Sequence, residues 1–199
     1  LGVRLLAAPM TARLSAVDPE IDVQIRQVNR AGALRQLRQG EADLAITVSP
    51  PSAGRLTVRK IADYRLHLYL RADVLQGLGP VRDLRDLNGL RGIGYISDMI
   101  FDKELDYYAL LGREAEPALT SNSLIMQLRW CLSGVGICIL PDFVARAHPE
   151  LRVVLPQEIR LTRAFYLVRH LDDARVARIN RMAEVVVDRM RDALADCPP

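Results

Sequence analysis

The segment GVGICILPDFVA, residues 134–145, predicts a tight turn, a buried strand and the start of a helix in direct succession. Gly134 and Gly136 suit a turn and close packing because glycine has no Cβ. The apolar run 137–140 is typical of a strand covered on both faces. Pro141 then suits the first turn of a short helix, which we expect to end near Ala147. A buried strand followed by a helix is the repeating unit of an α/β fold.

The same alternation of strands and helices extends to both sides of this segment. We expect further strands at 3–7, 21–28, 43–48, 56–61, 66–71, 92–96, 118–120, 151–155 and 164–169. We expect helices at 10–17, near 33–40, at 99–111, after the Ser121–Ser123 cap as far as about Leu132, and from Asp172 onward. The pattern predicts an α/β fold with a largely parallel sheet and two β/α lobes in tandem.

The lobes are expected to be discontinuous in sequence. Residues 1–70 plus 170–199 form lobe I, and residues 71–169 form lobe II. The chain crosses between them near Leu70 and near Val168. Two lobes joined by two crossing strands can hinge, and a ligand is expected in the crevice between them.

Composition places the chain among folded globular proteins. Half of its 199 residues are apolar, which argues against disorder. The net charge of +3 is small and arginines alternate with acidic residues, so the chain alone is not expected to bind DNA. No apolar run reaches about 18 residues, so no transmembrane helix is expected. The apolar start, residues 1–9, is interpreted as a strand rather than a signal peptide.

Catalysis finds little support in the residue types. His67, His148 and His170 are far apart in sequence, and no nucleophile elbow, phosphate loop or metal-ligand spacing occurs. The glycines at 134 and 136 lack the third glycine of a dinucleotide-binding fingerprint and precede a strand rather than a helix. We therefore expect no enzyme activity, no cofactor and no metal.

The cysteine pattern argues against a secreted disulfide framework, because the count is odd. Cys131 and Cys138 lie in apolar segments and are expected in the core, whereas Cys197 lies near the exposed end. A redox-sensing role for these thiols is left open.

Polar residues that follow strands are the candidates for ligand binding, because open α/β sheets bind ligands at the carboxyl ends of their strands. In lobe II the candidates are Ser97, Asp98, Thr120, Ser121 and Asn122, with Tyr95 and Phe143 as walls. In lobe I they are Met10, Thr11, Thr47 and Ser49.

Each candidate also has a purely structural interpretation. Asp98 suits a helix N-cap, and capping accounts for one residue of the run 120–123. Thr47 and Ser49 suit a loop that satisfies itself, and Tyr95 and Phe143 suit the core. Ser97 with the amides of a helix start would hold an anion such as a carboxylate, whereas Asp98 favours a neutral or cationic group.

Four anchors together resemble the effector-binding domain of LysR-type transcriptional regulators. They are Pro19-Glu20-Ile21-Asp22-Val23, Gly40-Glu41-Ala42-Asp43-Leu44-Ala45-Ile46, the opening segment 134–145, and an ending formed by Pro149-Glu150-Leu151 and Phe165-Tyr166-Leu167-Val168-Arg169-His170. No anchor is specific alone, but their order and spacing cover nearly the whole chain. The sequence departs from the family between Pro9 and Pro19, where the first helix is usually longer, which puts roles for Met10 and Thr11 in doubt.

The resemblance implies two Rossmann-like lobes joined by two crossing strands, a fold like that of type 2 periplasmic binding proteins. It implies a small-molecule effector between the lobes, a homodimer or homotetramer, and a cytoplasmic location without membrane contact. Promoter DNA would be bound through an N-terminal winged helix-turn-helix domain that this chain lacks.

Two other classes share this fold. A solute-binding protein of a transport system is the first alternative, and the segment that precedes Leu1 in the gene would decide it: a winged helix-turn-helix or a secretion signal. An enzyme, such as a deaminase-like or dehydratase-like relative, is the second, and saturable turnover lost on substitution of Asp98 would support it.

Overall fold

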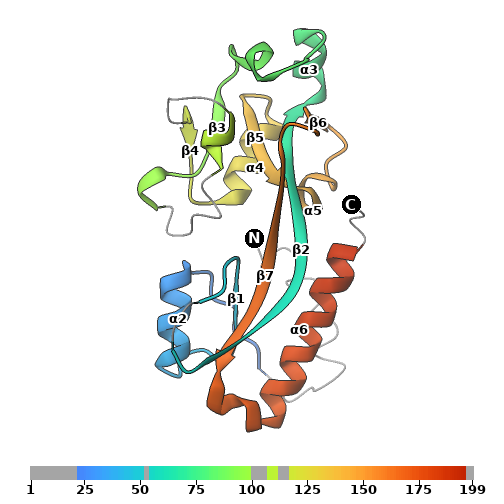
Figure 1. The fold of residues 1–199 in the computed structure, drawn as a ribbon. Coiled ribbons are helices and arrows are strands. Elements are labelled where there is room, and N and C mark those ends of the chain that lie inside the picture. The colour runs from blue at the N-terminus through green and yellow to red at the C-terminus, as the bar shows by residue number, and fades with distance from the viewer. Residues whose placement is uncertain (1–21, 52–53, 100–106, 112–116, 196–199) are drawn as a thin grey trace. The chain divides into compact units, whose positions relative to one another are not determined.

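The computed structural model describes residues 22–51, 54–99, 107–111 and 117–195, in two compact units (Figure 1). Unit 1 comprises Leu1–Asp63 with Ala164–Pro199, and unit 2 comprises Tyr64–Arg163. The strands β2 (Leu56–Arg71) and β7 (Arg160–His170) each contribute residues to both units. The unit boundaries therefore fall several residues before the crossings expected near Leu70 and Val168. That these units act as two regulatory lobes stays a prediction.

In the described part of unit 1, two helices pack against strands. β1 (Ala45–Thr47) runs antiparallel to β7, with Ala45 opposite Val168. α2 (Arg30–Arg38) covers this pair through Leu37, which is buried against Ala45 and Val168. The Asn29 side chain caps α2 by accepting a hydrogen bond of 2.8 Å from the Gly32 amide.

The second helix of unit 1 is α6 (Ala177–Ala195). Its buried residues recur at helical spacing and form one apolar face: Ile179, Ala183, Val186, Val187, Met190 and Leu194. This confirms that the last part of the chain forms a helix, as expected. The expected start is wrong, because Asp172 and Asp173 lie in a separate 3-10 helix, Leu171–Arg175.

Unit 2 contains a parallel ladder of three strands, in the order β4-β3-β5. These are β3 (Gly92–Gly94), β4 (Leu119–Thr120) and β5 (Ile137–Pro141). β2 pairs antiparallel with β5 and also with β6 (Leu151–Val154). The described residues of this unit also form the helices α3 (Ala72–Leu78), α4 (Leu124–Leu132) and α5 (Asp142–Ala145), with 3-10 helices at Leu84–Leu87, Ser97–Met99 and Tyr108–Leu111.

Glycines allow the close approach of backbones in this ladder. A Cβ on Gly136 would lie 2.4 Å from the Arg91 carbonyl oxygen, which also accepts a hydrogen bond from the Ile137 amide. Gly134 has φ of 73°, in the left-handed region that glycine favours. The turn and the close packing expected from these two glycines are confirmed.

Several element predictions are confirmed and others are wrong. The α/β class, β4, β5 and α4 with its Ser123 cap agree with the sequence analysis. The largely parallel sheet is wrong, because the neighbours of β2 and β7 that have a defined register run antiparallel to them. The strands expected at 56–61 and 66–71 are one strand, which is largely exposed at its start and buried toward its end, so its apolar pattern changes midway.

Two further expectations fail in the described residues. Residues 22–28 form no strand, and Val23, Ile25 and Val28 are exposed, because alternating side chains do not by themselves supply a hydrogen-bonding partner. Residues 97–99 and 108–111 are 3-10 helices rather than the ends of one α-helix. The strand and helix expected at 3–7 and 10–17 lie outside the described residues. α3 was not expected, and none of its residues is buried.

Candidate functional site

The carboxyl ends of three strands meet along one edge of unit 2. The registers Gly94 with Thr120 and Ile93 with Cys138 align β4, β3 and β5 in parallel. We call this line the carboxyl edge. It carries Tyr95–Asp98 after β3, Thr120–Asn122 at the end of β4, and Asp142 and Phe143 after β5. All seven ligand candidates of lobe II therefore lie along it.

The turn after β4 is fixed by hydrogen bonds. The Ser121 amide donates to the Gly94 carbonyl over 3.1 Å, which ties the two strand ends together. The Ser121 hydroxyl accepts from the Ser123 amide, and the Ser121 carbonyl accepts from the buried Gln127 amide group at 2.7 Å. The Ser123 hydroxyl caps α4 at Met126. Much of this polar run is thus used to build the turn.

Exposed polar side chains remain on the same edge. Ser97, Asp98 and Asn122 are exposed, and we call these three residues the rim. Ser97 and Asp98 belong to a 3-10 helix of three residues, so Asp98 does not cap a long helix in the described residues. The rim offers a hydroxyl, a carboxylate and an amide to solvent.

Two tyrosines pack together next to the end of β3. Tyr95 and Tyr107 pack edge to face, with ring centroids 6.1 Å apart, and their hydroxyls are hydrogen bonded. Burial raises the pKa of Tyr95 to about 12 and raises the pKa of Tyr107 well above its ordinary value. Both phenols are therefore neutral hydrogen-bonding groups near neutral pH.

A second buried network joins β2 to α5. The Asp142 carboxylate lies 2.9 Å from His67 Nδ1 and accepts a hydrogen bond of 2.8 Å from the Tyr69 hydroxyl. Only 8% of Asp142 is exposed. We call the four residues Tyr95, Tyr107, His67 and Asp142 the floor. A buried carboxylate needs such partners, so Asp142 holds the start of α5 and with it Phe143, whose ring packs edge to face on Tyr64 at 5.6 Å.

Sequence reasoning missed Tyr107, His67 and Asp142. Tyr107 had no signal beyond its apolar character. Asp142 directly follows a buried strand, and this position alone marks it as a residue of the carboxyl edge. His67 was dismissed because the histidines are far apart, whereas its partner is a carboxylate 75 positions away.

The lobe I candidates lie in unit 1 or outside the described residues. Thr47 and Ser49 are buried; the Thr47 hydroxyl donates to the Ser49 carbonyl, and the Ser49 hydroxyl accepts from Arg30. Met10 and Thr11 lie outside the described residues. Ligand contact by any of the predicted site residues stays a prediction.

The described cysteines are core residues, as expected. Cys131 and Cys138 are fully buried, and Cys197 lies outside the described residues. Burial raises the pKa of the Cys131 thiol to about 12 and that of Cys138 well above its ordinary value. Because the thiolate is the reactive form, both thiols are poor nucleophiles in the folded chain.

A protein-family model, the LysR substrate binding domain, matches residues 2–191. The chain belongs to this family. Comparison with curated proteins finds no significant match. In the residues that the structure describes, no helix is long and apolar enough to cross a membrane, and no group of histidine, cysteine or acidic side chains is arranged to hold a metal.

Solved structures share the fold of this LysR substrate binding domain. The regulatory domain of CrgA, a LysR-type regulator from Neisseria meningitidis, is 22% identical, with a TM-score of 0.78 and coverage of 94% of this chain and 93% of that one. A longer CrgA structure has a TM-score of 0.79 at 22% identity over 94% of this chain, which spans only 65% of it. The reduced regulatory domain of OxyR2 from Vibrio vulnificus is 18% identical, with a TM-score of 0.72 and coverage of 94% and 90%. The expected fold, like that of type 2 periplasmic binding proteins, is confirmed.

Proposed function

We propose that this domain senses a small-molecule effector and that the effector binds at the carboxyl edge of unit 2. The observation that carries the proposal is the parallel register of β4, β3 and β5, which aligns the ends of three strands. Ligands of open α/β sheets bind at such strand ends. The exposed rim, Ser97, Asp98 and Asn122, supplies side chains that are not buried in the fold.

The chemistry of the edge favours an effector that donates hydrogen bonds. Asp98 places an exposed carboxylate on the rim, and like charge disfavours an anion beside it. The helix start that would have offered amides to an anion at Ser97 is a short 3-10 helix. A small molecule bearing an amine or hydroxyl groups therefore matches the rim better than a carboxylate does.

The effector acts by shifting an equilibrium of the full-length regulator. It must bind one arrangement of the protein more tightly than the other, since equal affinity shifts nothing. The proposal includes closure of two lobes over the effector, a homodimer or homotetramer, and promoter DNA bound through a winged helix-turn-helix domain in the cytoplasm. It includes no catalytic step.

A thermal-shift screen tests the proposal. The chain is melted with amines, amino acids, sugars, aromatics and small carboxylates, because a ligand that binds the native state raises the melting temperature. The same screen is repeated with Ser97→Ala and Thr120→Ala on the edge. Ser133→Ala is the matched control, because its hydroxyl bonds the Arg129 carbonyl at the far end of α4.

A shift lost in both edge variants and kept in the control supports the proposed site. A shift that persists in both edge variants would refute the assignment of the effector to this edge.

A further inference from the structure

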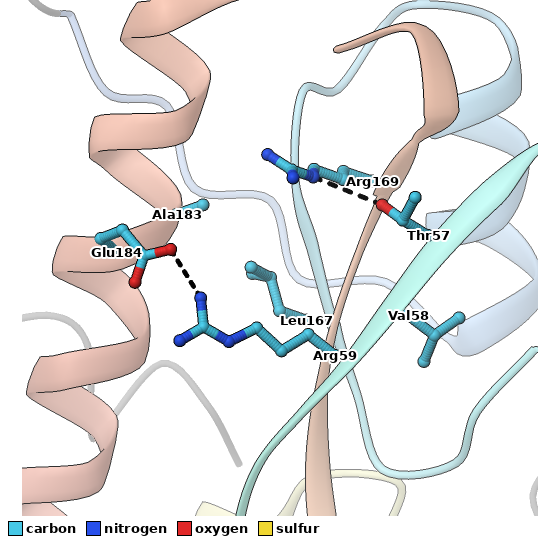
Figure 2. Close-up of a pocket in the computed structure, with 7 residues that line it drawn as sticks. All are labelled: Thr57, Val58, Arg59, Leu167, Arg169, Ala183 and Glu184. Atoms are coloured by element: carbon cyan, nitrogen blue, oxygen red, sulfur yellow. Dashed lines mark hydrogen bonds and ion pairs between the residues drawn. The ribbon is translucent and has the colours of Figure 1, made fainter. Parts of the chain in front are cut away.

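A pocket of about 80 Å³ lies within unit 1, where α6 faces β2 and β7 (Figure 2). Thr57 and Arg59 come from β2, Leu167 and Arg169 from β7, and Ala183 and Glu184 from α6. Residues two apart on a strand share a face. Both strand pairs therefore present side chains to the same side, and the helix covers it. None of these residues belongs to the carboxyl edge of unit 2.

The lining of the pocket combines apolar and charged side chains. Leu167 and Ala183 are 4% and 3% exposed, so their methyl groups form a buried apolar wall of the pocket. Figure 2 shows Arg59 reaching toward Glu184 beside Leu167, with Arg169 on the neighbouring strand. An apolar wall with a few fixed polar groups is the usual composition of a small-molecule site.

The two arginines differ in their partners. Arg59 Nη1 lies 2.6 Å from Glu184 Oε1, so those two charges compensate each other. Arg169 donates from Nε to the Thr57 hydroxyl at 3.3 Å and from Nη1 to the Asn180 side-chain oxygen, both of which are neutral acceptors. Within the described residues Arg169 forms no ion pair, which leaves the pocket one positive charge in excess.

We propose that this pocket binds a small monocarboxylate, held by Arg169 with its alkyl end on Leu167 and Ala183. A guanidinium has five donors, and Arg169 commits two in the bonds above, so its remaining donors suit a carboxylate. At roughly 10–15 Å³ of such space for each water-sized group, the pocket of about 80 Å³ holds about five to eight heavy atoms. Propionate meets this limit, and larger aromatic acids exceed it. The inference rests on unit 1 alone and does not depend on the effector site.

An NMR titration of the isotope-labelled 199-residue chain with propionate tests the inference. Chloride replaces propionate at constant ionic strength in the reference samples. We expect saturable shifts of the backbone amides of Leu167, Ala183 and Glu184, with a Kd in the millimolar range for so small a ligand. Shifts confined to residues 95–98 and 120–122, or no saturable shift, would overturn the proposal.

Variants separate recognition from general charge effects. Arg169→Gln is expected to raise the Kd about tenfold or more, because it removes the charge and the fork that bind the carboxylate. Arg169→Lys keeps the charge and is expected to fall between. Arg55→Gln is the matched control, since Arg55 is an exposed arginine near the start of β2 that pairs with Asp172 at 3.0 Å.

The remaining outcomes are also decisive. Equal weakening by Arg55→Gln and Arg169→Gln would mean non-specific screening and would contradict the site. Sulfate that binds as tightly as propionate would contradict the carboxylate class, because sulfate has no alkyl end to contact the apolar wall formed by Leu167 and Ala183. If Arg169→Gln lowers the melting temperature strongly, Arg169→Lys serves as the test: unchanged affinity for propionate in a folded Lys variant would overturn recognition of the carboxylate by the guanidinium fork of Arg169.

Discussion

The rim and the floor of the carboxyl edge each contain an aspartate that follows a strand, and the two aspartates have different surroundings. Asp98 and Asp142 both follow strands of the same parallel ladder. Asp98 is exposed to solvent, whereas Asp142 is buried against His67 and Tyr69. The difference teaches that an aspartate after a strand is not yet a ligand residue. An aspartate at this edge is available to a ligand only when its carboxylate oxygens are not already hydrogen bonded to other side chains.

Breaking the ladder that carries both regions is expected to have the largest effect. In Gly136→Ala the new Cβ would lie 2.4 Å from the Arg91 carbonyl oxygen, a backbone atom that cannot move without disturbing the β3–β5 pairing. We expect a loss of about 3 kcal/mol in the free energy of unfolding. Urea denaturation followed by circular dichroism measures it. Gly89→Ala, where a Cβ meets nothing within 4 Å, is expected to change stability by less than about 0.5 kcal/mol. Equal effects would contradict this account of the ladder.

Removing one aspartate from each region sharpens the comparison. Asp142→Ala leaves the Tyr69 hydroxyl and His67 without their shared partner in a buried place, so we expect a loss of about 2 kcal/mol. Asp98→Ala is expected to cost less than about 0.5 kcal/mol because the side chain is exposed. Paired urea titrations of the two variants give both values. A stability loss at Asp98 as large as that at Asp142 would show that the rim is structural.

The floor, and not the rim, is expected to respond to alkaline pH. Tyr95 has a folded pKa of about 12 against an ordinary 10.0, so the unfolded chain loses this proton first as the pH rises. Its stabilising contribution is complete below about pH 10 and is lost between about pH 10 and 12, reaching about 1 kcal/mol of loss near pH 11. Urea denaturation at several pH values measures the loss. Tyr95→Phe is expected to remove only the share of Tyr95, because burial also raises the pKa of Tyr107, Cys131 and Cys138. A loss as large in Tyr95→Phe as in the unmodified chain would contradict burial of Tyr95 as a cause.

The smallest expected effect is that of thiol labelling, which probes the packing around the buried thiols of Cys131 and Cys138. Burial keeps Cys131 and Cys138 protonated, so labelling of both by iodoacetamide is expected to be slow in the native chain and fast in urea. Mass spectrometry of peptides locates the label. Rapid native labelling of Cys138 would argue for an opening of the core around β5 and would support a redox role.

Sequence reasoning reached much of the fold because buried strands have a strong local signal. The run Ile137–Pro141 is fully buried, and its apolar character alone predicted β5. The segment Asp22–Val28 has an alternating pattern just as clear, yet it is exposed and forms no strand. Pairing depends on distant residues, which a local pattern does not contain.

The candidate site was predictable in position but not in detail. The rule that ligands bind at strand ends placed Ser97, Asp98 and Asn122 on one edge. The partnership of His67 with Asp142 joins residues 75 positions apart, and nothing in either local sequence announces it. The Ser121 hydroxyl and carbonyl oxygens likewise accept hydrogen bonds from Ser123 and Gln127, which only the folded structure reveals.

The most direct test of the central claim is the affinity of the screened effector for Asp98→Asn, measured by calorimetry beside the unmodified chain and Ser133→Ala. The exchange keeps the size of an exposed side chain and removes its charge, so the melting temperature without ligand should not change. The account predicts a Kd raised about tenfold in Asp98→Asn and unchanged in Ser133→Ala. An unchanged Kd in Asp98→Asn would contradict recognition of the effector by the rim.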